Sequence, residues 1–126
     1  MKRGALLLCA VWMLTACATP IVRDAGLDRL AVRKAERDLS VGIRAYEDGD
    51  YRTSARSLQS ALSAGLILRS DKVAAHKYLA FMHCAQSREK ACREEFRKAL
   101  ELDPDFQLTA AESGHPLWGP VFRSLR

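Results

Sequence analysis

The sequence predicts an all-α fold built from antiparallel helical hairpins. Three observations carry this prediction. Alanine, leucine, arginine, glutamate and lysine, which favour helices, dominate the 126 residues. Apolar residues recur at steps of three and four, the period of a helix with one buried face. Glycine and proline are sparse and lie at the ends of these periodic segments, where helices stop.

The first sixteen residues have the pattern of an export signal. Lys2 and Arg3 precede an uncharged, mainly apolar run over residues 4–16. A helix over that run spans about 20 Å, less than the roughly 30 Å of a membrane core, which favours a cleaved signal peptide over a transmembrane helix. The run ends in Leu14-Thr15-Ala16-Cys17, which resembles the lipobox of bacterial lipoproteins. The alternatives are an ordinary signal peptide with a coincidental cysteine, or a buried helix.

The lipobox resemblance implies that the chain is cut before Cys17 and that acyl chains on Cys17 hold it to a membrane. Ala18, not aspartate, follows the cysteine, which by the enterobacterial sorting rule implies the outer membrane with the domain facing the periplasm. We therefore divide the chain into a signal peptide over 1–16, a lipidated tether over 17–26 and a helical domain over 27–126.

Four helices joined by short turns are expected in the domain. The first begins at Leu27 and ends at the turn Gly49-Asp50; the second covers 51–64 with Gly65 past its end. The third covers about 72–85 with Ser70 or Asp71 as its cap, and the fourth starts from Ser87 and ends at Asp103-Pro104. A polar link from Thr109 leads to a last, partly helical segment over 115–125. The short turns make the four helices two consecutive hairpins.

The two hairpins repeat one pattern of small and bulky residues. Gly42 on the first helix corresponds to Ala80 on the third, and the second and fourth helices match at three positions each, namely Ser54, Leu58 and Ala61 against Cys92, Phe96 and Ala99. Small residues let two helices approach closely, and the bulky residue then fills the space between hairpins. This spacing, with Pro104 at the boundary, resembles the tetratricopeptide (TPR) repeat over residues 38–104.

The TPR resemblance has departures, and it leaves the ends of the stack open. Gly42 and Ala80 are 38 positions apart, against about 34 in the family, and neither copy has the usual tryptophan. Two repeats alone are marginal because each must bury its face on a neighbour. We expect the long first helix and the 115–125 segment to cap the stack, the latter through its apolar residues, Leu117, Trp118, Val121 and Phe122.

Two cysteines remain once Cys9 leaves with the leader and Cys17 is acylated. Cys84 lies near the end of the third predicted helix and Cys92 one turn into the fourth, so an antiparallel hairpin brings them toward each other. Exported domains occupy an oxidising compartment, which permits disulfides. We predict a Cys84–Cys92 disulfide; the alternative is two buried free thiols.

The TPR resemblance also implies where a partner binds, because the first helices of such hairpins line the concave face. Exposed apolar residues bordered by charges suit a groove for a peptide or helix. The alternative is that the long first helix folds over this surface and makes it core. The partner-binding candidates are Leu39, Ile43, Tyr46, Glu47, Lys77 and Phe81.

Metal binding, catalysis and nucleic-acid binding find little support in the sequence. His76 and His83 share one side of the third helix, so a metal site is the alternative to weigh. The TPR resemblance places them where the family has core residues, so we interpret them as core histidines, and no paired zinc-ligand spacing is present. No phosphate loop, nucleophile elbow or zinc-protease motif occurs, so neither an enzyme nor a cofactor is expected. Lys2 and Arg3 of the leader account for two units of the +5 net charge. The basic residues of the remaining chain are interleaved with acidic residues, which disfavours a nucleic-acid partner.

The C-terminal stretch over 111–123 is not a TPR element. Together with the lipobox and the two cysteines, it is similar to TssQ-like lipoproteins associated with type VI secretion. This resemblance implies a lipid-anchored adaptor or scaffold that binds a protein partner in the cell envelope. The alternatives are an assembly factor for another envelope machine, such as a pilus or an outer-membrane complex, or a small peptidoglycan-associated binding module.

Overall fold

Six helices and no strand make up residues 20–126, the part of the chain that the computed structural model describes. The all-α prediction is confirmed. The predicted signal peptide, Cys17 and Ala18 lie outside the described residues. The helices are α1 (Pro20–Glu47), α2 (Tyr51–Ala64), α3 (Arg69–Ala85), α4 (Glu89–Leu102), α5 (Ala110–Ser113) and α6 (Gly119–Arg123).

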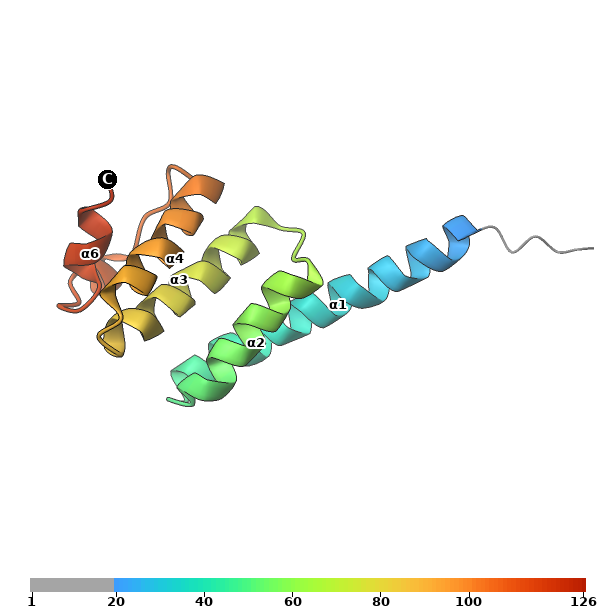
Figure 1. Cartoon of the computed structure of the whole chain (residues 1–126), viewed down its shortest axis with the longest axis horizontal. Coiled ribbons are helices and arrows are strands. Elements are labelled where there is room, and N and C mark those ends of the chain that lie inside the picture. Colours follow the sequence, from blue (N-terminus) through green and yellow to red (C-terminus); the bar gives the residue numbers. More distant parts are fainter. Residues whose placement is uncertain (1–19) are drawn as a thin grey trace, which may run out of the picture.

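The four long helices form two antiparallel hairpins that stack side by side. Helix α1 packs along α2, α3 packs along α4, and α2 and α3 join the hairpins (Figure 1). Helix α1 is twice the length of α2, with 28 residues against 14. Its first half therefore extends beyond the hairpin body, and the first fully buried residue along it is Ala35. None of the helices in residues 20–126 is long and apolar enough to cross a membrane.

The equivalent positions of the two hairpins occupy equivalent places in the core. Gly42 is buried against Leu58, so close that a β-carbon on the glycine would lie 2.7 Å from Cγ and Cδ2 of that leucine. In the second hairpin Ala80 takes the glycine's place and Phe96 the leucine's, and both are fully buried. The small residues predicted on the second helices are fully buried as well, namely Ser54, Ala61, Cys92 and Ala99.

The core consists of two apolar clusters. The first includes Leu58 of α2 and Leu79 of α3, so it lies between the two hairpins. The second includes Phe81 of α3, Phe96 of α4 and Phe122 of α6, so it lies between the second hairpin and the C-terminal segment. The half-buried rings of Tyr46 and Tyr78 pack against both clusters, so they join the hairpins.

The C-terminal segment covers the side of the second hairpin that faces away from the first hairpin (Figure 1). The ring of Phe122 on α6 lies 5.1 Å from Phe96 and 5.6 Å from Phe106, edge to face. Trp118 stacks on Phe81 with 4.4 Å between ring centroids, and its indole nitrogen donates to the carbonyl of Glu112. The predicted cap is therefore present. Leu117 is the one of its four expected apolar residues that stays largely exposed, at 49%.

Two helix ends follow the predicted turn chemistry. The Asp50 carboxylate accepts a hydrogen bond from the Thr53 backbone N–H and caps α2. Hydrogen bonding with the Thr53 side chain, and then with its backbone N–H, holds the pKa of Asp50 below its ordinary value. Gly65 ends α2 in the left-handed conformation, with a φ of 95°.

Other boundaries differ from the prediction. Helix α1 begins at Pro20, within the expected tether over 17–26, because proline is favoured at the first helical position and an exposed helix needs no apolar period. Helix α3 begins at Arg69 with no side-chain cap, so neither Ser70 nor Asp71 caps it. Thr109 belongs to a capping box with Glu112 that starts the short α5, where only a polar link was expected.

Ser87 does not cap the fourth helix. It has a φ of 60°, the left-handed conformation that glycine usually takes just after a helix, and its backbone N–H donates to the carbonyl of Cys84. Helix α4 then begins at Glu89 after Arg88. Serine is a common cap at the start of a helix, which is why the sequence alone suggested that Ser87 caps the fourth helix. In the structure, Ser87 instead takes the position after α3 that glycine usually occupies.

Candidate binding surface

A shallow groove of about 360 Å³ runs along one side of α1. Three of the six predicted partner-binding residues line it, namely Leu39, Ile43 and Glu47. Leu39 forms its buried floor, Ile43 is half-buried and Glu47 is exposed. Three further residues complete its walls: Glu36, Ser40 and Arg44. We did not predict these three, although each lies three positions before one of the predicted residues Leu39, Ile43 and Glu47, which places it on the same side of a helix.

The other three predicted residues do not line this groove. Phe81 is only 2% exposed because Trp118 covers it, so the surface expected on the third helix is core. The covering element is the C-terminal segment, not the first helix. Lys77 is half-buried, its Nζ 2.7 Å from Oε1 of Glu112 and 4.7 Å from the centre of the Tyr78 ring.

Tyr46 belongs to a row of aromatic rings that crosses the first helices of both hairpins. Its ring centroid lies 5.5 Å from Tyr51, 5.0 Å from Tyr78 and 6.2 Å from Phe81. Burial, with a smaller effect of the neighbouring tyrosines, raises the pKa of Tyr46 to about 12, so its hydroxyl stays protonated at physiological pH. Tyr46 therefore joins the hairpins and is half-buried.

The two predicted cysteines are bonded. The Cys84 and Cys92 sulfurs are 2.08 Å apart, and the bond ties the end of α3 to the first turn of α4. Both residues are buried, so the disulfide is part of the core of the second hairpin.

The two histidines of α3, which we expected in the core, are both half-buried, so neither is fully enclosed. Nδ1 of His76 is 2.6 Å from Oε2 of Glu95 on α4. His83 is half-buried, and burial lowers its pKa, so the neutral ring is favoured. Within residues 20–126, no group of three or more histidine, cysteine, aspartate or glutamate side chains is arranged to hold a metal ion.

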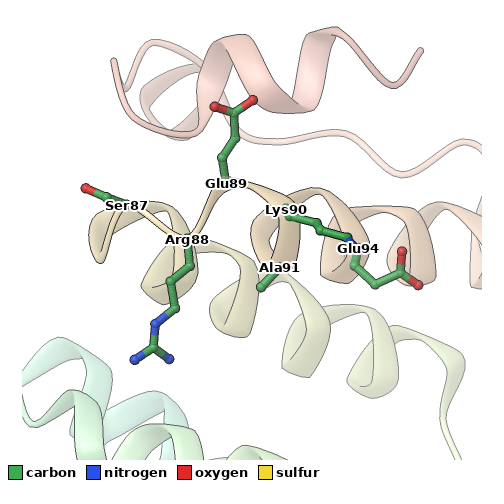
Figure 2. Close-up of a pocket in the computed structure, with 6 residues that line it drawn as sticks. All are labelled: Ser87, Arg88, Glu89, Lys90, Ala91 and Glu94. Carbon is green, nitrogen blue, oxygen red and sulfur yellow. The ribbon is translucent and has the colours of Figure 1, made fainter.

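A second hollow, of about 710 Å³, lies at the turn between α3 and α4. Figure 2 shows that its charged side chains diverge: Glu89 points toward the C-terminal segment and Arg88 away from it, while Lys90 and Glu94 extend along α4. No polar groups converge on one position there, so this hollow has no arrangement that selects a ligand. The α1 groove combines a partly exposed apolar residue with charges of both signs, and it is the better candidate.

Comparison with protein-family models, curated proteins and solved structures found no match to the chain.

Proposed function

We propose that this chain is a lipid-anchored adaptor of the bacterial cell envelope that binds a protein partner along the α1 groove. The single observation that carries the proposal is the position of that groove: Leu39, Ile43 and Glu47 line it on a helix that continues toward Cys17. The proposed setting is the periplasmic side of the outer membrane. The resemblance of residues 111–123 to TssQ-like lipoproteins favours type VI secretion as the assembly.

The anchor supplies the mechanism. A module tethered to a surface stays at high effective concentration near partners on that surface, so weak contacts suffice for stable association. Helix α1 supports this role because it links the proposed lipid site to the hairpin body without a break between Pro20 and Glu47.

The groove's chemistry indicates the kind of partner. Ile43 offers apolar area in the groove. Glu36 and Glu47 lie near the two ends of the groove, about 16 Å apart along the helix at 1.5 Å per residue. An amphipathic helix with an apolar face and basic flanks fits this arrangement, because it buries apolar area at the centre and places cations near the carboxylates. Salt bridges at the rim add mainly specificity.

Site-specific photo-crosslinking in cells tests the proposal. A benzophenone amino acid replaces Ile43 in the groove or, as the matched control, Ile67, which is 68% exposed in the loop between α2 and α3. We expect a discrete crosslinked protein from position 43 and none from position 67. The identity of the captured protein then distinguishes type VI secretion from a pilus or another envelope complex.

Charge reversal of the groove supplies the second arm of the test. The double variant Glu36→Lys/Glu47→Lys should abolish the crosslink at position 43, whereas Glu101→Lys/Asp105→Lys, with the same change of net charge at exposed sites, should not. Equal products from both crosslinker positions, or a product that survives reversal of the groove, would contradict the proposed binding surface. Failure of Cys17→Ser to abolish acylation would contradict the proposed anchor.

A further inference from the structure

A stripe of basic and apolar residues follows the outer side of α1. Its members recur at steps of three and four, so they share one side of the helix, and none of them is acidic. All six are exposed, and Leu27 and Leu30 are each 64% exposed. The stripe consists of Leu27, Leu30, Lys34, Arg37, Val41 and Arg44. Arg44 lies at its border and also lines the α1 groove.

One side of α1, separate from the stripe, packs against the protein core. Ala35, Leu39 and Gly42 face the core on another side of the helix. Lys34 forms an ion pair with Asp38, but Arg37 and Arg44 have no carboxylate within ion-pair distance among the described residues. An exposed helix side with leucines and unpaired arginines is typical of segments that lie at a membrane surface.

We propose that this stripe rests on the anionic phospholipid surface to which the chain is anchored. The inference rests on the proposed lipid attachment at Cys17. Only Ala18 and Thr19 separate Cys17 from Pro20, and a chain spans at most about 3.5 Å per residue, so the anchor keeps the start of α1 within roughly 10 Å of the acyl chains. Leu27 and Leu30 then enter the headgroup boundary, and the basic side chains face anionic lipid.

A second copy of the chain is a weaker occupant of the same stripe. The spacing of three and four also occurs in coiled coils, where the repeated positions are apolar. Here basic residues, namely Lys34, Arg37 and Arg44, occupy three of the six repeated positions. A symmetric pair of helices would therefore bring like charges together. The same charges attract an anionic surface, and the attraction adds to the tether.

Spin labelling of the full-length, cell-produced lipoprotein tests the inference. Because Cys84 and Cys92 are bonded and Cys17 is acylated, an introduced cysteine is the free thiol available for labelling. Leu30→Cys places the label on the stripe, and Asp28→Cys places it two residues away on a different side of α1. The proteins are reconstituted into vesicles of phosphatidylethanolamine with phosphatidylglycerol, or of phosphatidylcholine alone. Collisions with an aqueous nickel complex and with oxygen report the depth of each label.

We expect the label at position 30 to lose nickel accessibility several-fold and to gain oxygen accessibility in the anionic vesicles, while the label at position 28 stays aqueous. Lys34→Glu/Arg37→Glu should restore nickel accessibility at position 30. Arg69→Glu/Lys90→Glu, with the same change of net charge at exposed sites elsewhere, should not.

The outcomes separate the inference from its premise. An acylated protein whose label at position 30 stays aqueous in anionic vesicles overturns the inference alone. Protection that is equal in both lipids, with dipolar broadening between labels, assigns the stripe to a second copy and also overturns it. A protein that carries no acyl chain on Cys17 contradicts the proposed function, and the premise of the inference fails with it.

Discussion

The close contact between α1 and α2 at Gly42 predicts the effect of a substitution there on stability. A steric clash lowers the stability and a gain in helix propensity raises it. In Gly42→Ala, the new β-carbon would lie 2.7 Å from Cγ and Cδ2 of Leu58 and 3.2 Å from its backbone nitrogen. Leu58 is fully buried, so its side chain has no free space to rotate into. Overpacking of a core usually costs about 1–3 kcal/mol, and a clash with a fixed neighbour belongs at the upper end.

Helix propensity acts in the opposite direction. Alanine favours an α-helix over glycine by about 1 kcal/mol, which offsets part of the clash. The net expectation is a loss of about 2 kcal/mol in the free energy of unfolding, or a melting temperature lower by roughly 8 °C for a domain of this size. Urea unfolding of the mature chain, followed by far-ultraviolet circular dichroism, measures the free-energy change.

The control is the same substitution in the same helix. A β-carbon at Gly26 meets nothing within 4 Å, so Gly26→Ala should leave stability unchanged or slightly higher. A double-mutant cycle adds Leu58→Ala, which removes the clashing atoms. The cost of the pair should fall below the sum of the single costs by at least about 1 kcal/mol. A Gly42→Ala protein as stable as the wild type would refute the close-approach argument.

Two further predictions concern the second hairpin. Reduction of the Cys84–Cys92 bond, which closes a loop between positions eight apart, should lower the free energy of unfolding by about 2–3 kcal/mol; identical urea curves with and without reductant would contradict this. For Glu95, burial acts to raise the pKa, but hydrogen bonds with His76 and Lys98 outweigh it and hold the pKa below 4.5. The ionised carboxylate therefore stabilises the fold above about pH 4.5, and this stabilisation is lost as the pH falls through the folded-state pKa. Between neutral pH and about pH 3, the free energy of unfolding should therefore fall less in Glu95→Gln than in the wild type. Urea unfolding at both pH values measures this difference, and equal decreases in the two proteins would contradict the stabilising role of the Glu95 carboxylate.

Much of the hairpin architecture could be predicted from the sequence. The bounds of α2 match at both ends, because Asp50 and Gly65 are turn signals that act through local backbone chemistry. The small-residue positions also match, since Gly42 and Ala80 must be small for the helices to meet. Prediction failed at α1, where an irregular tether was expected over residues that the helix includes from Pro20. Apolar periodicity marks only helices that bury one face, whereas residues 26–30 of α1 are all exposed.

The candidate binding surface could be predicted only in part. Family resemblance placed Leu39, Ile43 and Glu47 together, and they line one groove. It also placed Phe81 there, but the tryptophan 37 positions later in the chain covers that ring. Sequence spacing records which residues share a side of one helix, and it carries no information about which distant segment returns to cover that side.

The sequence by itself predicted the four long helices, both ends of α2, the repeated small-residue contacts and the pairing of Cys84 with Cys92. Each of these depends on residues that are close together in the chain or lie in one hairpin. Only the tertiary structure decided which of the apolar residues stay exposed. Phe81 is buried because the C-terminal segment returns and places Trp118 over its ring. Leu27 and Leu30 are exposed because α2 is shorter than α1 and does not reach them. Solvent exposure is a property of the packed whole, so a local pattern cannot fix it.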